Sequence, residues 1–286
     1  MPSGALAGKS ALVTGASTGI GRDCALTLAR VGMTTYAGVR RAEDAQALQA
    51  QAEGDLRPIS LDVTDPASIT AARERLQADQ GPRGLDALIN NAGFCLVGPL
   101  ETTSMTALLN QFQVNAIGPI AVTQAFLPML RTARGRVVMM SSISGLFSSP
   151  FVGPYAGSKF ALEALSDSLR MELLAQGVTV SVLQPGPIRT PLWQKTTSEA
   201  ASAFPQVPQE IQQLYAPLFL KMGERAARSG QTGDDPSVVT RVILRALTDR
   251  SPKSRYGVGR GGFLWRTMRA LPDRWRDAMI LYALRH

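Results

Sequence analysis

The sequence predicts an α/β fold, a doubly wound parallel sheet of about seven strands with helices on both faces. Short β-rich segments alternate with longer helical patterns along the 286 residues, which is typical of a parallel sheet. A glycine-rich loop follows the first expected strand, and polar, glycine-rich or proline-rich residues follow later ones. Because ligands bind at the carboxyl ends of the strands in such sheets, we expect these residues to line one cleft.

The expected strands are short β-rich runs at residues 10–14, 34–39, 57–61, 87–90, 136–141, 179–183 and 255–258. The expected helices lie between them, at residues 20–31, 42–52, 66–80, 105–132, 155–176 and 236–248. The helix over 105–132 is expected to break near Gly118. Right-handed connections between successive parallel strands then distribute the helices over both faces of the sheet.

We expect one domain over residues 1–286, with a C-terminal elaboration. The residues are 45% hydrophobic, enough for a sizeable core, and the interior has no Ser/Gly-rich or Pro-rich linker and no repeat. The expected core covers residues 8–190. Residues 191–235 are expected to form a substrate lid, helical over 191–222, and residues 236–286 a helix, a short strand and a basic tail.

Composition excludes several kinds of site. Two cysteines, Cys24 and Cys95, cannot build a disulfide framework, and we expect buried reduced thiols. The one histidine is His286, so neither a metal site nor histidine base catalysis is expected. Residues 1–9 do not resemble a signal peptide, and no apolar run reaches the roughly 18 residues that span a bilayer. We therefore expect a soluble cytoplasmic protein.

Positive charge is concentrated at the C-terminal end. The chain carries 30 Lys and Arg against 22 Asp and Glu, a net charge of +8, and residues 250–286 hold nine basic and two acidic residues, or +7. Apolar side chains such as Trp265 and Trp275 are interleaved there. We expect a helix pair that covers a pocket and exposes a basic face. Peripheral contact with an anionic membrane stays an alternative, and nucleic-acid binding is not expected.

The motif Thr14-Gly15-x-x-x-Gly19-Ile20-Gly21 joins the first strand to the first helix and predicts a dinucleotide site. Glycines permit a tight turn and let backbone N–H groups approach a pyrophosphate at the positive helix N-terminus. The spacing differs from G-x-G-x-x-G, and alone it is compatible with an ordinary glycine turn. The residues expected to contact the cofactor here are Gly15, Ser17, Thr18, Gly19, Ile20 and Gly21.

The end of the second strand indicates which nicotinamide cofactor is bound. An acidic residue there would bind the 2′-hydroxyl of NAD, but the strand ends in Val39-Arg40-Arg41. A guanidinium pairs with phosphate in a bidentate way, so Arg40, with help from Arg41, predicts NADP(H). Two alternatives stay open. The two arginines can be solvated loop residues that do not contact a cofactor, and the protein can be an NAD-dependent alcohol dehydrogenase.

Tyr155-x-x-x-Lys159, with Ser142 upstream, predicts acid–base chemistry. The pKa of tyrosine is ordinarily near 10, and a nearby ammonium lowers it by favouring the phenolate. Residues four apart lie on one face of a helix, so Lys159 can act on Tyr155. Ser142, or its neighbour Ser141, follows a buried strand and can stabilise charge that develops on a substrate oxygen.

These residues resemble the short-chain dehydrogenase/reductase family, whose fold is Rossmann-like. The resemblance spans most of residues 10–190 and includes Asn90-Asn91-Ala92-Gly93. It implies that Tyr155 is the general acid or base and that Ser142 binds the substrate oxygen. It also implies that Lys159 holds the nicotinamide ribose and that Asn115 holds a water linking Lys159 to solvent. The further cofactor contacts that it implies are Asp62, Val63, Asn91, Ala92, Gly93, Pro185, Gly186, Ile188 and Thr190.

The substrate side is expected to be apolar. The expected contacts, beside Ser142, are Phe94, Phe147, Val152 and Trp193, although each is also compatible with a place in the core. Apolar pockets select apolar ligands, so we expect a hydrophobic ketone, aldehyde or secondary alcohol. The overall pattern is similar to the hydroxysteroid and retinol dehydrogenase branch of the family.

The sequence thus predicts an NADP(H)-dependent oxidoreductase. A non-catalytic NADP(H) sensor on the same fold is the alternative, because fold does not fix function. A sensor, however, does not need Asn115, Ser142, Tyr155 and Lys159 together. A third possibility is a membrane-surface scaffold that works through the basic tail. The family commonly forms homodimers or homotetramers through helices at 105–132 and 155–176, and we expect the same here.

Overall fold

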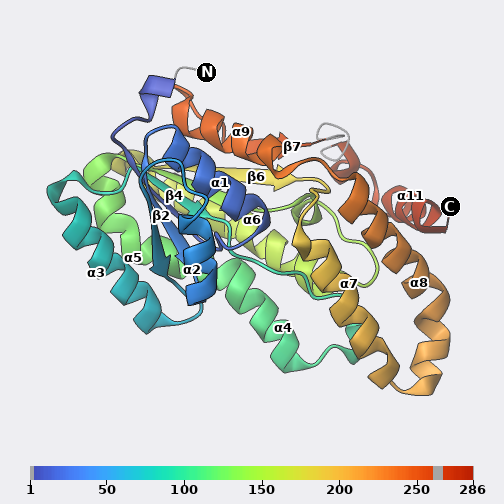
Figure 1. Ribbon diagram of the computed structural model, residues 1–286. Helices are drawn as coiled ribbons and strands as arrows, with labels where there is room; N and C mark the ends of the chain where they lie inside the picture. Colours follow the sequence, from blue (N-terminus) through green and yellow to red (C-terminus); the bar gives the residue numbers. More distant parts are fainter. Residues whose placement is uncertain (1–2, 260–266, 286) are drawn as a thin grey trace.

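A parallel sheet of seven strands forms the centre of the computed structural model, which describes residues 3–259 and 267–285 (Figure 1). The order across the sheet is β3-β2-β1-β4-β5-β6-β7, and each neighbouring pair is parallel. The direction of the order changes between β1 and β4, where open sheets of this kind bind ligands. The strands are β1 (Ser10–Val13), β2 (Thr34–Val39), β3 (Leu56–Ser60), β4 (Ala87–Asn90), β5 (Arg136–Met140), β6 (Thr179–Pro185) and β7 (Arg255–Val258).

The predicted doubly wound sheet is confirmed, and its strands differ from the expected ranges by at most two residues at an end. Part of the basic tail, including Arg260, Trp265 and Arg266, lies outside the described residues, as does His286. The helices are α1 (Gly19–Arg30), α2 (Ala42–Gln49), α3 (Pro66–Gln80), α4 (Met105–Phe112), α5 (Gly118–Ala133), α6 (Gly153–Leu173), α7 (Pro191–Ala203), α8 (Gln209–Thr232), α9 (Pro236–Thr248) and α11 (Asp273–Arg285).

Helices cover both faces of the sheet because the strands are apolar on both faces. In β1, Ala11 and Val13 pack on the side of α1, α2 and α9, whereas Leu12 packs on the side of α3, α5 and α6. All four residues of β1 are buried, as expected for a central parallel strand. The sheet therefore has one hydrophobic core above it and a second below it.

Several helices begin at a residue that caps the free backbone N–H groups of the first turn. Asp65 accepts a hydrogen bond from the backbone of Ala67 at 2.9 Å and precedes Pro66, which starts α3. Asp235 does the same for Ser237 at 3.0 Å before Pro236 and α9. An acidic N-cap followed by proline at the first helical position stabilises both starts.

The expected break near Gly118 is a π-helical segment, Gln113–Ile117, between α4 and α5. Gly118 lies against the loop between β3 and α3, since an added Cβ atom would be 2.9 Å from Cγ2 of Val63 in that loop. Single π-helical turns inside helices are frequent at functional sites. This one carries the buried Asn115 toward the carboxyl end of β4.

The C-terminal helices form a separate group at the side of the sheet toward which β6 and β7 point (Figure 1). Helix α7 packs against α8, and α8 packs against α11. Arg225 of α8 donates a hydrogen bond to the carbonyl of Ala283 in α11 at 3.0 Å. Within the described parts of the chain, every helix is too short or too polar to cross a bilayer.

We predict that Leu130→Ala lowers the free energy of unfolding by about 2–5 kcal/mol, because Leu130 is fully buried between α5 and the sheet. The matched control is Leu174→Ala, the same substitution at a side chain that is 74% exposed, and we expect a loss below about 0.5 kcal/mol. Urea-induced unfolding measures both. Equal losses for the two variants would contradict the position of Leu130 in the core.

Candidate active site

The glycine loop after β1 is shaped so that it leaves room for a ligand. Gly15 has φ +62° and Gly19 has φ +56°, a conformation that favours glycine. A Cβ atom on Gly21 would collide with the carbonyl oxygen of Gly15 and the side-chain amide of Asn91, so only glycine fits there. The N-terminus of α1 follows directly and offers a positive site for an anion.

Thr14 and Asn91 hold the glycine loop in place through hydrogen bonds. The Asn91 side-chain nitrogen donates to the carbonyls of Thr14 and Gly15, both at 3.0 Å. The Thr14 hydroxyl accepts hydrogen bonds from the backbone of Asn91 and Ala92, both at 3.0 Å. Sequence reasoning assigned Asn91 to the cofactor and did not assign a role to Thr14. In the structure both residues join the ends of β1 and β4 and so fix the conformation of the loop.

The opposite wall of this cleft comes from the end of β6. A Cβ atom on Gly19 would lie 3.1 Å from Cγ2 of Thr190. The segment from Pro185 to Thr190 is fixed by backbone hydrogen bonds between Gly186 and Val258 at 3.0 Å and between Arg189 and Asp234 at 2.8 Å. Ile188 forms a parallel bridge with Asp234. Gly19 and Thr190, two predicted cofactor residues that are far apart in the sequence, therefore lie against each other.

Arg40 and Asp62 share a polar hollow of about 390 Å³ at the ends of β2 and β3. Burial works to raise the pKa of Asp62, but hydrogen bonds from Thr64 and the nearby Arg40 guanidinium bring it below its usual value. Arg41 precedes α2 as its N-cap residue and is exposed. The residues that line the hollow are Arg40, Ser60, Asp62, Asp65, Ala67, Ser68 and Ala71.

Tyr155 and Lys159 lie one turn apart at the start of α6, as predicted. The Lys159 ammonium is buried, donates to the carbonyl of Met140 at 2.7 Å, and is 5.7 Å from the centre of the Tyr155 ring. Burial lowers the pKa of Lys159 to about 8, although Cys95 and Glu163 act in the opposite direction. The ammonium therefore predominates at neutral pH.

The pKa of Tyr155 is raised, and this differs from the expectation that Lys159 makes the tyrosine more acidic. Burial is the main cause and Cys95 adds to it, whereas a hydrogen bond with Ser142 lowers the pKa. The reason for the difference is that a low-dielectric surrounding disfavours the phenolate more than its neighbours favour it. Tyr155 is thus protonated at neutral pH.

The structure distinguishes the two serines after β5. Ser142 caps the short helix Ile143–Gly145 by accepting from the backbone of Ser144 at 3.1 Å, and of the two serines it is the one that lowers the pKa of Tyr155. The Ser141 hydroxyl is buried and has no hydrogen-bond partner among the described residues. This arrangement agrees with the choice of Ser142.

Asn115 connects the π-helical segment to the loop after β4. Its side chain accepts from the backbone N–H of Phe94 at 3.1 Å and donates to the Phe94 carbonyl at 2.9 Å and the Ser158 hydroxyl at 3.2 Å. Gln111 supports the same loop by accepting from the backbone of Leu96 at 2.7 Å. Both N–H groups of the Asn115 side chain are used inside the protein, and its expected contact with a water stays a prediction.

An aromatic cluster covers the substrate side. Phe151 packs edge-on against Tyr215, with ring centres 5.9 Å apart, and against Phe219 at 5.3 Å, and Phe204 stacks on Phe219 at 4.2 Å. The Tyr215 hydroxyl donates to Glu101 at 2.8 Å. These contacts attach α8 to the loops that precede α4 and α6.

The predicted substrate contacts occupy different surroundings. Phe94, Phe147 and Val152 are half-buried on the loops after β4 and β5. The Trp193 indole donates to the Ile188 carbonyl at 2.7 Å, and the side chain packs on Gly230 of α8. Trp193 therefore joins α7 to α8, a role that its place in the sequence did not reveal, and its contact with substrate stays a prediction.

Comparison with known proteins agrees with this geometry. Residues 9–201 match the family model described as short chain dehydrogenase. The chain is 36% identical to retinol dehydrogenase 5 of Mus musculus, over 95% of this chain and 87% of that protein. It is 30% identical to an NADPH-dependent 3-dehydrocapnine reductase of Ornithobacterium rhinotracheale, over 93% and 94%.

The fold matches as well. A short-chain dehydrogenase from Streptomyces avermitilis superposes with a TM-score of 0.76 and 28% identity, covering 96% of each chain. Several independent features thus agree: the sheet order, the glycine loop, the buried lysine and the sequence likeness. The chain belongs to the short-chain dehydrogenase family of oxidoreductases, and among its relatives it is similar to the retinol dehydrogenases.

Proposed function

We propose that this protein transfers a hydride between NADP(H) and a hydrophobic ketone, aldehyde or secondary alcohol, with Tyr155 as the general acid or base. The observation that carries the proposal is the meeting of three groups at the carboxyl end of β5. Ser142 lowers the pKa of the Tyr155 hydroxyl, and the buried Lys159 ammonium lies 5.7 Å from the centre of the same ring.

The residues at the other end of the cleft fit a dinucleotide. The glycine loop and the α1 N-terminus suit a pyrophosphate, and Thr190 faces the loop from β6. When bound, the nicotinamide supplies or accepts the hydride. The contribution of the protein is to orient the cofactor and to hold a proton at the Tyr155 oxygen.

The pKa directions favour reduction. A protonated Tyr155 can give its proton to a carbonyl oxygen as negative charge develops there, and Ser142 can stabilise that charge. Lys159 stays charged up to about pH 8, so its field favours the phenolate that the proton transfer leaves behind. The role of Asn115 is to fix the π-helical segment and α6 around this pair through Ser158.

Tyr155→Phe should lower kcat about 10²–10⁴-fold, because the ring and its packing are kept while the proton donor is lost. Dissociation constants for NADPH, measured by the quenching of protein fluorescence, should stay close to that of the unmodified protein. Ser141→Ala is the matched control and should keep most of the turnover. Turnover of the Phe variant equal to that of the unmodified protein would remove Tyr155 from the proposal.

The preference for NADP(H) rests on Arg40. Its side chain lines the hollow beside Asp62, at the strand ends where a 2′-phosphate would lie. The name of the Ornithobacterium relative also includes NADPH dependence. Arg41 is adjacent in sequence, does not line this hollow and is expected to contribute less.

Arg40→Gln should raise the Kd for NADPH about 10–100-fold and leave that for NADH nearly unchanged, because one charge-assisted contact is lost. Arg41→Gln is the matched control and should have the smaller effect. Isothermal titration with both cofactors measures this. Equal Kd values of the Arg40 variant and the unmodified protein for NADPH would refute the assignment.

An apolar substrate is supported by the aromatic cluster over the site. The Phe151, Phe204 and Phe219 rings pack against one another there. We propose that α7 and α8 act as the lid, with the Tyr215–Glu101 hydrogen bond holding it closed. Retinol dehydrogenase 5, a relative by sequence, is named for an alcohol of this kind.

We also propose a homodimer or homotetramer built through α4 and α6. Large apolar side chains are exposed on these helices and the segment between α4 and α5. They are Met105 (65% exposed), Leu109 (68%), Ile117 (49%) and Phe160 (43%). Association through this surface would bury them.

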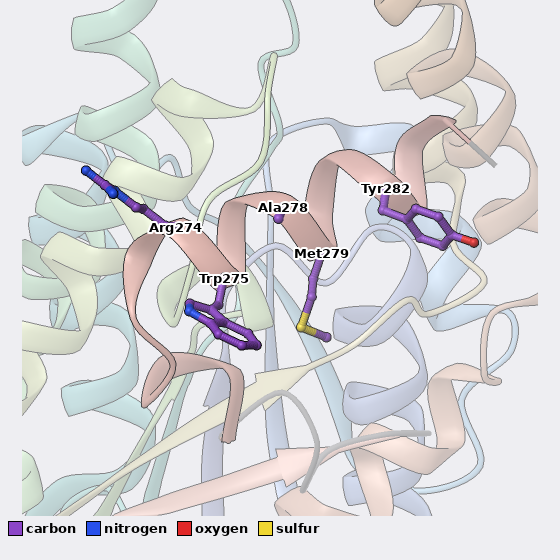
Figure 2. Close-up of a pocket in the computed structure, with 5 residues that line it drawn as sticks. All are labelled: Arg274, Trp275, Ala278, Met279 and Tyr282. Carbon is purple, nitrogen blue, oxygen red and sulfur yellow. The ribbon is translucent and has the colours of Figure 1, made fainter.

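Finally, we propose that α11 makes peripheral contact with anionic lipid. Trp275, Met279 and Tyr282 are 70%, 47% and 67% exposed and recur at helical spacing. Figure 2 shows Trp275 and Met279 projecting from the same side of α11, next to a shallow hollow of about 490 Å³. Arg274 lines the same hollow, and residues 250–286 carry a net charge of +7. Exposed aromatic side chains with basic neighbours are typical of interfacial helices.

The protein should therefore co-sediment with phosphatidylcholine vesicles that contain phosphatidylglycerol, and less with vesicles that lack it. Trp275→Ser should weaken this binding, and high salt should weaken it further. Leu174→Ser, at an equally exposed side chain far along the sequence, serves as the control. If Trp275→Ser changes only the sedimentation coefficient in lipid-free solution, the face contacts a second copy and the lipid proposal is wrong.

A further inference from the structure

A third ionisable residue follows Tyr155 and Lys159 on the same face of α6. Glu163 lies four residues beyond Lys159, which puts the three side chains at successive turns. Glu163 is 5% exposed, so its carboxylate is as deeply buried as the Lys159 ammonium. A buried carboxylate is costly unless it is hydrogen-bonded and paired.

Two donors from two strands hold this carboxylate. The Gln184 side chain, at the end of β6, donates to Oε1 at 3.0 Å. Arg255, the first residue of β7, donates to Oε2 through its Nε at 2.9 Å. Both oxygens of the Glu163 carboxylate therefore accept a hydrogen bond, and these two bonds hold the carboxylate between α6 and the sheet. The Gln184 amide oxygen has no partner among the described residues, because its NH₂ group is turned toward Glu163.

Arg255 is shared between two acids. Its terminal nitrogen contacts Asp167 at 2.6 Å, one turn further along α6, and Asp167 also pairs with Arg170 at 3.2 Å. Asp167 is partly exposed, whereas Glu163 is the member that faces the interior. The charges thus alternate from Lys159 and Glu163 of α6 to Arg255 of β7, and back to Asp167 and Arg170 of α6.

The groups around Lys159 come from each element packed against it. Met140 of β5 supplies a carbonyl, Tyr155 of α6 its ring, and the loop after β4 brings Cys95. The carboxylate of Glu163, one turn further along α6, opposes the effect of burial on the pKa of Lys159. The Glu163 side chain also packs against Gly145, where the Ser141 hydroxyl and the backbone carbonyl of Lys159 are its neighbours.

We propose that Glu163 is a positioning residue, which acts through Lys159 by keeping that side chain charged at the base of the site. The inference rests on the proposed function only where it concerns turnover. Held by Gln184 and Arg255, the carboxylate provides a fixed negative charge that offsets the burial of the ammonium.

The test follows the titration of lysines in the full-length protein labelled with ¹³C at Cε. The chain has five lysines, so the spectrum is simple, and Lys159→Arg identifies the Lys159 signal. In Glu163→Gln, the pKa of Lys159 should fall by about one unit from its value of about 8. In Asp167→Asn, which removes the other acidic partner of Arg255, the pKa of Lys159 should stay unchanged. An unchanged Lys159 titration in Glu163→Gln, or an equal fall in both variants, would overturn the inference.

Arg255→Gln provides a second variant with the opposite sign, for the case that Glu163→Gln does not fold. Removing this cation leaves the field of Glu163 unopposed, so the pKa of Lys159 should rise. A fall or no change would also overturn the inference. Glu163→Asp, which keeps the charge, should restore most of the wild-type value.

Turnover gives an independent readout. In NADPH-dependent reduction of a hydrophobic aldehyde, the fall of kcat/KM at alkaline pH should begin at a lower pH in Glu163→Gln than in Asp167→Asn. An unmoved profile beside a shifted Lys159 titration would remove the catalytic part of the inference. The titration needs neither cofactor nor substrate. Failure of the unmodified protein to reduce any aldehyde would instead count against the proposed function.

Discussion

The ammonium of Lys159 lies inside the protein, where an unpaired charge costs several kcal/mol. The fold offsets this cost with the Met140 carbonyl at 2.7 Å, the face of the Tyr155 ring and the carboxylate of Glu163. Tyr155 and Glu163 lie on α6 together with Lys159, so the hydrogen bond to Met140 of β5 is the contact that sets the height of α6 above the end of β5. The same height places the Tyr155 hydroxyl next to Ser142. One buried charge therefore sets the register of the helix against the sheet, and the position of Tyr155, the proposed acid–base group, follows from it.

Burial acts on the two groups in a coordinated way. It raises the pKa of Tyr155 and lowers that of Lys159, so each is pushed toward its neutral form. For Lys159, the carboxylate of Glu163 opposes this lowering of the pKa. The result is a protonated phenol beside a charged ammonium at neutral pH. This is the combination that suits proton donation to a carbonyl oxygen, because the ammonium stabilises the phenolate only once it forms.

Much of the fold and of the cofactor cleft could be predicted from the sequence because they depend on local patterns. The strands follow from short apolar runs, the break near Gly118 from one residue, and Tyr155 with Lys159 from helical spacing. The supporting residues could not be predicted in the same way. Thr14 holds Asn91 across 77 residues, and Glu163 meets Arg255 across 92, so their partners appear only once the sheet is assembled. Glu163 did carry one signal, its spacing of four from Lys159, which points it at the same face of the helix.

The two halves of the proposed cleft, one for cofactor and one for substrate, differ in how they are built, and this explains why one is easier to predict than the other. The cofactor half is mostly backbone, in which glycines at positive φ and hydrogen-bonded strand ends define the shape. The substrate half is made of side chains that pack across long sequence distances. There Phe151 itself has φ +67°, held by a hydrogen bond from the backbone of Gly98 at 2.9 Å and by its packing against Phe219. A bulky residue in that conformation is strained by about 1–2 kcal/mol, so its neighbours must over-determine it. Substitutions in α8 can therefore change the substrate half, while the backbone that forms the cofactor half stays as it is.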